Sequence, residues 1–159
     1  MTNTATLIGV LALAFCGAVA GCGGDDPAPP DLSKFVGSWT VTSGALTISC
    51  TDHRVQVIAV TEPTQLVLGG SSDLVDTDAT CPVLYDVAGT VATALPGQSC
   101  THPDVITRMN LVEDTFTTAD GVTATHRASG RLTSYNDITS GNPVQCDFFE
   151  MGVYERAGG

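Results

Sequence analysis

Apolar side chains recur at every second position in much of the chain from Phe35 onward, and this period constrains the fold more than any other feature. In the first such segment, Trp39 and Val41 fall on one face of an extended chain, while Ser38 and Thr40 fall on the other. No stretch of about ten residues or more in this region has the 3.6-residue spacing of an amphipathic helix. The sequence therefore predicts an all-β domain.

Turn signals divide the region into short strands. Ser43-Gly44, Ala88-Gly89 and Asp120-Gly121 each predict a hairpin, the last one with a type I′ turn. We predict strands at residues 35–42, 46–50, 55–61, 65–68, 83–87, 90–95, 105–112, 115–119, 122–128, 132–135 and 144–156. Short strands with turns at such intervals are typical of a β-barrel or a β-sandwich.

Residues 7–22 are a continuous apolar run, LIGVLALAFCGAVAGC. The run is shorter than the roughly 20 residues that a membrane-spanning helix needs, and the Gly and Asp residues that follow it could not continue a helix into lipid. It also lacks the polar positions that a helix packed on a soluble core would show. We therefore interpret residues 1–21 as an N-terminal signal helix that is removed from the mature protein.

The end of this leader, Val19-Ala20-Gly21-Cys22, resembles the lipobox of bacterial lipoproteins. In that family the cysteine sulfur receives a diacylglyceryl group and the cysteine becomes the new N-terminus. The resemblance implies lipidation of Cys22 as the only added group, with each buried CH₂ of the acyl chains contributing about 0.8 kcal/mol to membrane attachment. In such lipoproteins, Asp after the cysteine resembles an inner-membrane retention signal. Gly23 stands there, which implies the outer membrane and an extracytoplasmic domain.

The mature part divides into a tether and one domain. Residues 22–31 are rich in Gly, Pro and Asp, which predicts an extended tether, and residues 32–159 are long enough for one domain with its own core. The formal net charge is −11. Because phosphate binding needs a basic surface, this charge argues against nucleic acid as a partner. The partner classes that remain are a membrane, which the protein would contact through its lipid, and an unidentified envelope protein.

Four of the six cysteines remain once Cys16 leaves with the leader and Cys22 is lipidated. An even number in an oxidising compartment predicts two disulfides, for which three pairings are open. With Ala88-Gly89 as a turn, Tyr85 lies opposite Ala92, and this register brings Cys81 near Cys100. We therefore favour the pairs Cys81–Cys100 and Cys50–Cys146. Zinc would need ligands about two to four residues apart, and these cysteines are spread along the chain.

The two ends of the domain resemble the lipocalin and fatty-acid-binding-protein superfamily. Phe35-Val36-Gly37-Ser38-Trp39 is similar to its Gly-x-Trp opening, and Val153-Tyr154-Glu155-Arg156-Ala157 is similar to its closing strand. The resemblance favours an antiparallel up-and-down β-barrel over a β-sandwich. It implies that Trp39 plugs the barrel base and that Arg156 covers the ring in a cation–π pair. Gly152 replaces the Arg with which fatty-acid-binding proteins clamp a carboxylate, so the resemblance does not extend to that clamp.

His126 is the candidate polar contact inside the barrel. It alternates with Thr125 and Arg127 and shares a face with Ala124 and Ala128. If that face points inward, His126 projects into the lumen, either as a contact for a ligand or as a hydrogen-bonded interior residue. Small inward residues at Gly37, Ala124 and Ala128 would leave room for a cavity in a barrel of eight strands.

The sequence gives no positive sign of catalysis or metal binding. Asp73, Asp76 and Asp78 could gather around Ca²⁺, but residues 71–78 lack the Gly and Glu of an EF-hand loop, so we predict a solvated loop and no metal site. Nucleophile elbows, phosphate-binding Gly loops and close carboxylate pairs are absent, and we predict neither an enzyme nor a cofactor. Two functions stay open: a barrel that binds a small apolar ligand, and a filled barrel or sandwich that acts as a structural or protein-interaction surface.

Overall fold

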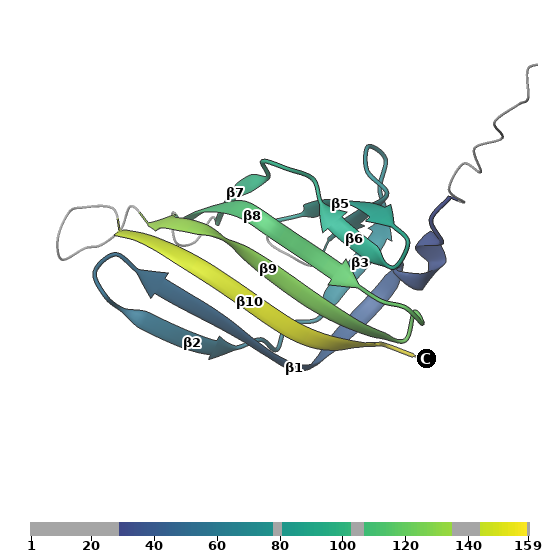
Figure 1. Cartoon of the computed structure of the whole chain (residues 1–159), viewed down its shortest axis with the longest axis horizontal. Helices are drawn as coiled ribbons and strands as arrows, with labels where there is room; N and C mark the ends of the chain where they lie inside the picture. The colour runs from purple at the N-terminus through teal and green to yellow at the C-terminus, as the bar shows by residue number, and fades with distance from the viewer. Residues whose placement is uncertain (1–28, 78–80, 103–106, 135–143, 159) are drawn as a thin grey trace, which may run out of the picture.

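Antiparallel strands close into a barrel in the computed structural model, which describes residues 29–77, 81–102, 107–134 and 144–158 (Figure 1). The strands are β1 Gly37–Cys50, β2 Val55–Ala59, β3 Thr64–Leu68, β4 Leu74–Asp76, β5 Val83–Ala88, β6 Val91–Ala94, β7 Ser99–His102, β8 Thr107–Thr117, β9 Thr123–Ser134 and β10 Val144–Arg156. The order around the barrel is β1-β3-β4-β5-β6-β8-β9-β10, and pairing of β10 with β1 closes the ring of eight strands. The predicted up-and-down barrel is confirmed, and its architecture is compatible with a lipocalin-like fold.

The barrel has a tall side and a short side. Strands β1, β8, β9 and β10 contain 14, 11, 12 and 13 residues, whereas β3 to β6 contain 5, 3, 6 and 4. The long strands therefore run past the short ones and continue as an open sheet in the order β2-β1-β10-β9-β8-β7 (Figure 1). We call the end where β3 to β6 complete the ring the closed end, and the opposite end the wide end.

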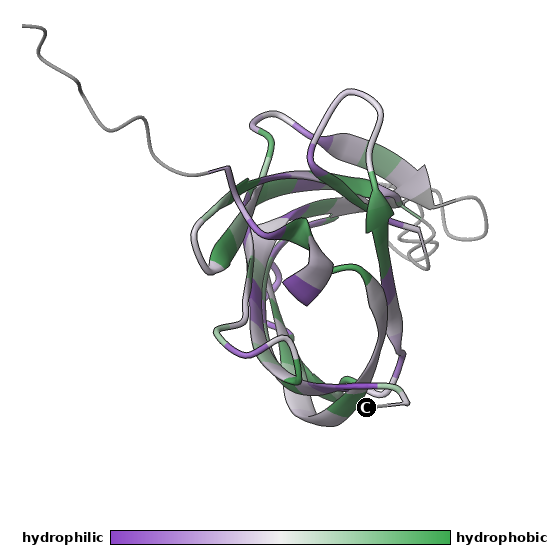
Figure 2. Ribbon diagram, turned by 90° about the vertical axis from the view of Figure 1, so that its right-hand side faces the viewer, coloured by the Kyte–Doolittle hydropathy of each residue, from purple (hydrophilic) through white to green (hydrophobic). Residues whose placement is uncertain are grey.

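A short 3₁₀-helix, η1 (Leu32–Lys34), lies across the closed end (Figure 2). Phe35, which follows it, and Trp39 on β1 are both fully buried. The Trp39 Nε1–H donates a hydrogen bond to the Phe35 carbonyl oxygen at 2.8 Å, so the indole N–H has its partner inside the core. The segment that leads into β1 therefore covers the closed end of the barrel.

Arg156 on β10 completes this cover. Its Cζ lies 5.5 Å from the Trp39 ring centroid, and its Nη2 donates to the carbonyl oxygens of Ser33, at 2.7 Å, and Val36. The structure therefore places Trp39 and Arg156 against each other at the barrel base, in the arrangement that the resemblance implies. One guanidinium joins the last strand to the segment that covers the closed end.

Replacing Arg156 with leucine should lower the free energy of unfolding by about 2 kcal/mol, because hydrogen bonds from a charged group and a cation–π contact are lost together. Arg127→Leu is the matched control, since the Arg127 guanidinium lies 5.3 Å from the ring of Phe149, which is 37% exposed. Its effect should stay within about 0.5 kcal/mol. Urea denaturation of both variants measures the difference, and equal losses would contradict this role of Arg156.

Two predicted turns are wrong. At Ser43-Gly44 the chain does not reverse, and β1 continues through a register shift between Val41 and Ser43. A Cβ at position 44 would lie 3.2 Å from the Gly152 Cα on β10, so this glycine permits a close approach of two strands. At the second site Gly89-Thr90, rather than Ala88-Gly89, forms the turn, because Gly89 adopts a φ of 61°.

The corrected turn changes the register but not the face of the strands. Tyr85 pairs with Ala94, whereas the sequence predicts Ala92. Both cysteine pairs that the sequence favours are nevertheless disulfide-bonded. Cys50–Cys146, with Cα atoms 3.9 Å apart, joins β1 and β10 at the wide end. Cys81–Cys100, with Cα atoms 5.8 Å apart, joins the segment just before β5 to β7.

The tall side has fewer breaks than predicted. The predicted strands at 105–112 and 115–119 belong to one strand, β8, which has a register shift between Leu111 and Glu113. Those at 122–128 and 132–135 likewise belong to β9. The hairpin predicted at Asp120-Gly121 is present with a longer loop, in which Asp120 Oδ1 accepts hydrogen bonds from the backbone N–H groups of Val122 and Thr123, both at 2.9 Å.

The predicted signal peptide, Cys22 and residues 22–28 of the predicted tether lie outside the described residues. In the part of the chain that is described, none of the helices has the length and apolar character required to cross a membrane.

Candidate functional site

Inward-facing side chains fill the closed end of the lumen with an apolar layer. Its buried members are Trp39, Leu66, Leu74, Val87, Ala92, Phe116, Ala124 and Tyr154. The Phe116 ring packs edge-on between two others, with centroid distances of 5.1 Å to Trp39 and 5.7 Å to Tyr154. The space predicted beside Gly37 and Ala124 is filled. A Cβ added at Gly37 would lie 3.2 Å from Arg156 Nε, and Ala124 is itself packed in this apolar layer. The closed end of the lumen is therefore packed with side chains.

A polar layer lies next along the lumen and is centred on His126 of β9. The Nε2 of His126 lies 2.9 Å from Asp114 Oδ1 on β8, and its Nδ1 lies 3.2 Å from Glu150 Oε1 on β10. The Tyr85 hydroxyl on β5 donates to the same Asp114 oxygen at 3.0 Å. A chain of hydrogen bonds thus links four strands across the barrel.

The charges in this layer are fixed by burial and by the neighbouring groups. Burial alone lowers the pKa of His126, but the hydrogen bonds and charges of Asp114 and Glu150 outweigh it and raise that pKa to about 10. Burial, together with the Asp114 charge, raises the pKa of the Tyr85 hydroxyl, which therefore stays protonated and donates. At neutral pH the layer holds one imidazolium between two carboxylates.

The structure shows His126 as an interior residue with both ring nitrogens engaged, and sequence reasoning missed both of its partners. Glu150 shares the inward face of β10 with Phe148 and Tyr154 at a period of two, a signal that could have found it. Asp114 likewise alternates with the buried Phe116 and Thr118, but the register shift between Leu111 and Glu113 separates it from the inward positions earlier in β8. It is 4% exposed.

Beyond the polar layer, the inner face of the wide end is apolar again. Ile48, Leu111, Leu132 and Phe148 lie there, most of them only partly buried. Gly130 on β9 is required beside Phe148, since a Cβ at that position would lie 2.6 Å from the Phe148 Cε1 atom. The wide end therefore presents apolar side chains that the barrel does not fully cover.

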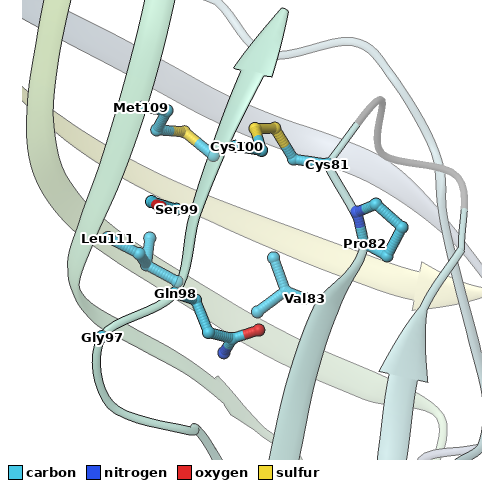
Figure 3. A pocket seen from close by; sticks show the side chains of 9 residues that line it. All are labelled: Cys81, Pro82, Val83, Gly97, Gln98, Ser99, Cys100, Met109 and Leu111. Atoms are coloured by element: carbon cyan, nitrogen blue, oxygen red, sulfur yellow. A yellow bond between two sulfur atoms is a disulfide. The ribbon is translucent and has the colours of Figure 1, made fainter.

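A pocket of about 310 Å³ lies at the wide end between β5, β7 and β8 (Figure 3). It is lined by Cys81, Pro82, Val83, Gly97, Gln98, Ser99, Cys100, Met109 and Leu111. The Cys81–Cys100 disulfide forms part of one side. Sequence reasoning singled out these two cysteines but not the pocket, because β7 was not predicted.

Gln98 builds one wall of this pocket and has its polar atoms occupied. Its Oε1 accepts from the Leu84 N–H at 2.8 Å, and its Nε2 donates to the carbonyl oxygens of Leu84, at 2.9 Å, and Leu95, at 3.0 Å. The side chain thereby continues the pairing of β5 beyond Ala94, where β6 ends. Its two amide N–H groups are thus already used within the protein.

Gln98→Ala should lower the free energy of unfolding by about 1–3 kcal/mol, because the half-buried Leu84 N–H loses its acceptor and the Leu95 carbonyl loses its donor from Gln98. Gln56→Ala is the control, since Gln56 is an exposed residue of β2, and its effect should stay within about 0.5 kcal/mol. Chemical denaturation measures both. If the two variants lose the same stability, the hydrogen bonds of the Gln98 side chain do not stabilise this part of the barrel.

The acidic segment 71–78 differs from the predicted solvated loop. Asp73 Oδ2 accepts from the Val87 N–H at 2.7 Å, and Asp76, only 9% exposed within β4, accepts from the Thr64 hydroxyl. Asp78 lies outside the described residues. Over the ranges that the structure covers, no three His, Cys, Asp or Glu side chains are grouped so that they could hold a metal ion.

Comparison with known proteins finds no matching family, no similar curated protein and no similar solved structure. The fold and the site therefore define the class: a disulfide-bonded antiparallel β-barrel that is filled at its closed end and has a pocket without charged residues at its wide end.

Proposed function

We propose that this chain is a lipid-anchored, extracytoplasmic protein whose barrel binds a small apolar molecule at its wide end. The pocket of about 310 Å³ carries the proposal. Its volume falls at the lower end of the roughly 300–1,000 Å³ typical of small-molecule sites. Val83, Met109 and Leu111 contribute apolar side chains to a lining that also holds polar groups. The packed closed end leaves the wide end as the place for such a ligand.

The lipobox-like Cys22 and the two disulfides support the compartment, since disulfides persist where the environment is oxidising. Gly23 after the cysteine favours the outer membrane. The described chain begins at Pro29, just before η1, so the proposed tether leaves from the closed end and the pocket lies at the opposite end.

Ligand binding is tested on protein purified from its host, delipidated and measured by native mass spectrometry. Wild type should carry a bound mass that gentle activation releases. Met109→Trp, which fills the pocket, should lose that mass, while Met151→Trp, at a position 56% exposed on β10, should keep it. Spectra without a bound mass in the wild type, or with the same mass in both variants, would contradict the proposal.

Anchoring is tested by metabolic labelling with a palmitate analogue. Wild type and Cys16→Ser should be labelled, because Cys16 leaves with the leader, whereas Cys22→Ser should be blank. If the wild type were as unlabelled as Cys22→Ser, the proposed lipid anchor would be contradicted. The proposal of a ligand pocket would then apply to a protein without that anchor.

A protein-interaction role is the second candidate, and the exposed edge strand β2 favours it. Val55 and Val57 are 67% and 68% exposed, and no charged residue protects the strand. Such an edge accepts a further extended strand with apolar side chains at alternate positions. A photocrosslinker at Val57 should then capture a protein in intact cells that one at Val112, 80% exposed on β8, does not. Equal capture at both positions argues against this role.

A further inference from the structure

We infer that the wide-end pocket selects an uncharged aromatic molecule of about two fused rings, an inference that rests on the proposed function and names its ligand class. Size is the first reason. A cavity of roughly 150 Å³ in an apolar core holds one benzene ring. The pocket here measures about 310 Å³, which gives room for a second ring.

Sulfur is the second reason. Three sulfur atoms belong to the lining residues, two in the Cys81–Cys100 disulfide and one in Met109, and Figure 3 shows these residues along one edge with Val83 and Leu111 below them. A sulfur atom at the edge of an aromatic ring contributes about 0.3–1.5 kcal/mol beyond apolar burial, and an aliphatic ligand gains none of it. The lining therefore favours a ring over an alkyl chain of equal volume.

The absence of charge among the lining residues is the third reason. None of these nine residues carries a formal charge. Both N–H groups of the Gln98 amide are used by backbone carbonyls, and the Ser99 hydroxyl accepts from Arg108 Nη2 at 3.3 Å. A carboxylate or an ammonium group would lose part of its hydration here without gaining an oppositely charged partner among these nine residues. The chain's net charge of −11 further disfavours an anion.

The carboxylates of the polar layer do not change this conclusion. Asp114, the next inward residue of β8 after Leu111, is already bonded to His126 and Tyr85, and it is not among the residues that line the pocket. The pocket is thus separate from the polar layer and has no charged residue in its own lining.

The test measures calorimetric affinities of the full-length, disulfide-bonded protein for four probes of similar size: 2-naphthalenemethanol, decanol, 2-naphthoate and 2-naphthylmethylammonium. The neutral aromatic probe should bind about tenfold more tightly than each of the others. Met109→Leu, which keeps the volume and removes the sulfur, should weaken 2-naphthalenemethanol about 2- to 10-fold and leave decanol unchanged. Met151→Leu, on the outer face, is the matched control and should alter neither affinity.

Each outcome decides between the proposals. Equal affinities for decanol and 2-naphthalenemethanol, or tightest binding of either charged probe, would overturn the aromatic inference and leave a small-molecule pocket in place. An identical response of Met109→Leu and Met151→Leu would overturn the role of sulfur. Failure of all four probes to bind would contradict the proposed function together with this inference.

Discussion

Replacing His126 with asparagine should lower the free energy of unfolding by about 3–5 kcal/mol at pH 7, because the substitution removes the cation between two largely buried carboxylates. The side chain of Asp114 is only 5% exposed and that of Glu150 only 21%, so neither charge can recover its hydration without a rearrangement of the barrel. Urea denaturation measures the loss.

His53→Asn is the matched control for this prediction. His53 is exposed in the turn after β1 and has a φ of 68°, a conformation that asparagine tolerates well. Its substitution should change stability by no more than about 0.5 kcal/mol. If His126→Asn behaves like His53→Asn, the polar layer does not stabilise the barrel.

The stability of the wild type should also fall as the pH rises from about 6.5 towards 10. The pKa of His126 is about 10 in the folded protein and near its ordinary value of 6.5 in the unfolded chain, so the folded state keeps a proton that the unfolded state loses in this interval. The contribution is fully present below pH 6.5 and is lost as the pH approaches 10. His126→Asn should lack this slope, and a slope unchanged in the variant would contradict the assignment.

Removing the Cys50–Cys146 disulfide, by replacing both cysteines with serine, should lower the free energy of unfolding by about 4–5 kcal/mol. The bond closes a loop with a sequence separation of 96 and joins the two strands that seal the barrel. Because a disulfide restricts the conformational entropy of the unfolded chain more when its loop is longer, removing this one should cost more stability than removing a disulfide with a short loop. The measurement is denaturation of the double variant, with hydrogen exchange in β1 and β2 reporting whether the wide end opens.

The second disulfide provides the comparison. Cys81–Cys100 has a sequence separation of 19, and its removal should lower the free energy of unfolding by about 3 kcal/mol. It should also disrupt the pocket, to which both cysteines belong, whereas loss of Cys50–Cys146 leaves the pocket lining intact. If removal of Cys81–Cys100 lowered the stability more than removal of Cys50–Cys146, the prediction that the longer loop contributes more would be contradicted.

Local pattern was enough to predict several elements of this barrel. Strand β10 runs from Val144 to Arg156, as predicted. The disulfide pairs could be favoured because a hairpin brings Cys81 close to Cys100, even though the predicted register was displaced. Trp39 and Arg156 were paired through the resemblance of the two chain ends, and the closed barrel places them in contact.

Other features of the structure depend on contacts between residues far apart in the chain, which local sequence patterns do not predict. Gly44 looks like a turn residue, but its role is to let β1 and β10 approach closely, which depends on a residue more than a hundred positions away. Asp114 alternates with Phe116, but the register shift before it breaks the period that would link it to Leu111. The pocket needs three strands, among them β7, whose four residues carry no alternation strong enough to predict a strand.

The most direct test of the account is an NMR titration of the full-length, disulfide-bonded protein with either neutral probe, decanol or 2-naphthalenemethanol. Binding at the wide end should produce saturable amide shifts at pocket residues, namely Val83, Gln98, Cys100, Met109 and Leu111, and should leave the closed end around Trp39 and Phe116 unmoved. Shifts confined to β2 and the outer face of β10, or no saturable shift with either probe, would contradict the claim that the wide end of this barrel is a binding site.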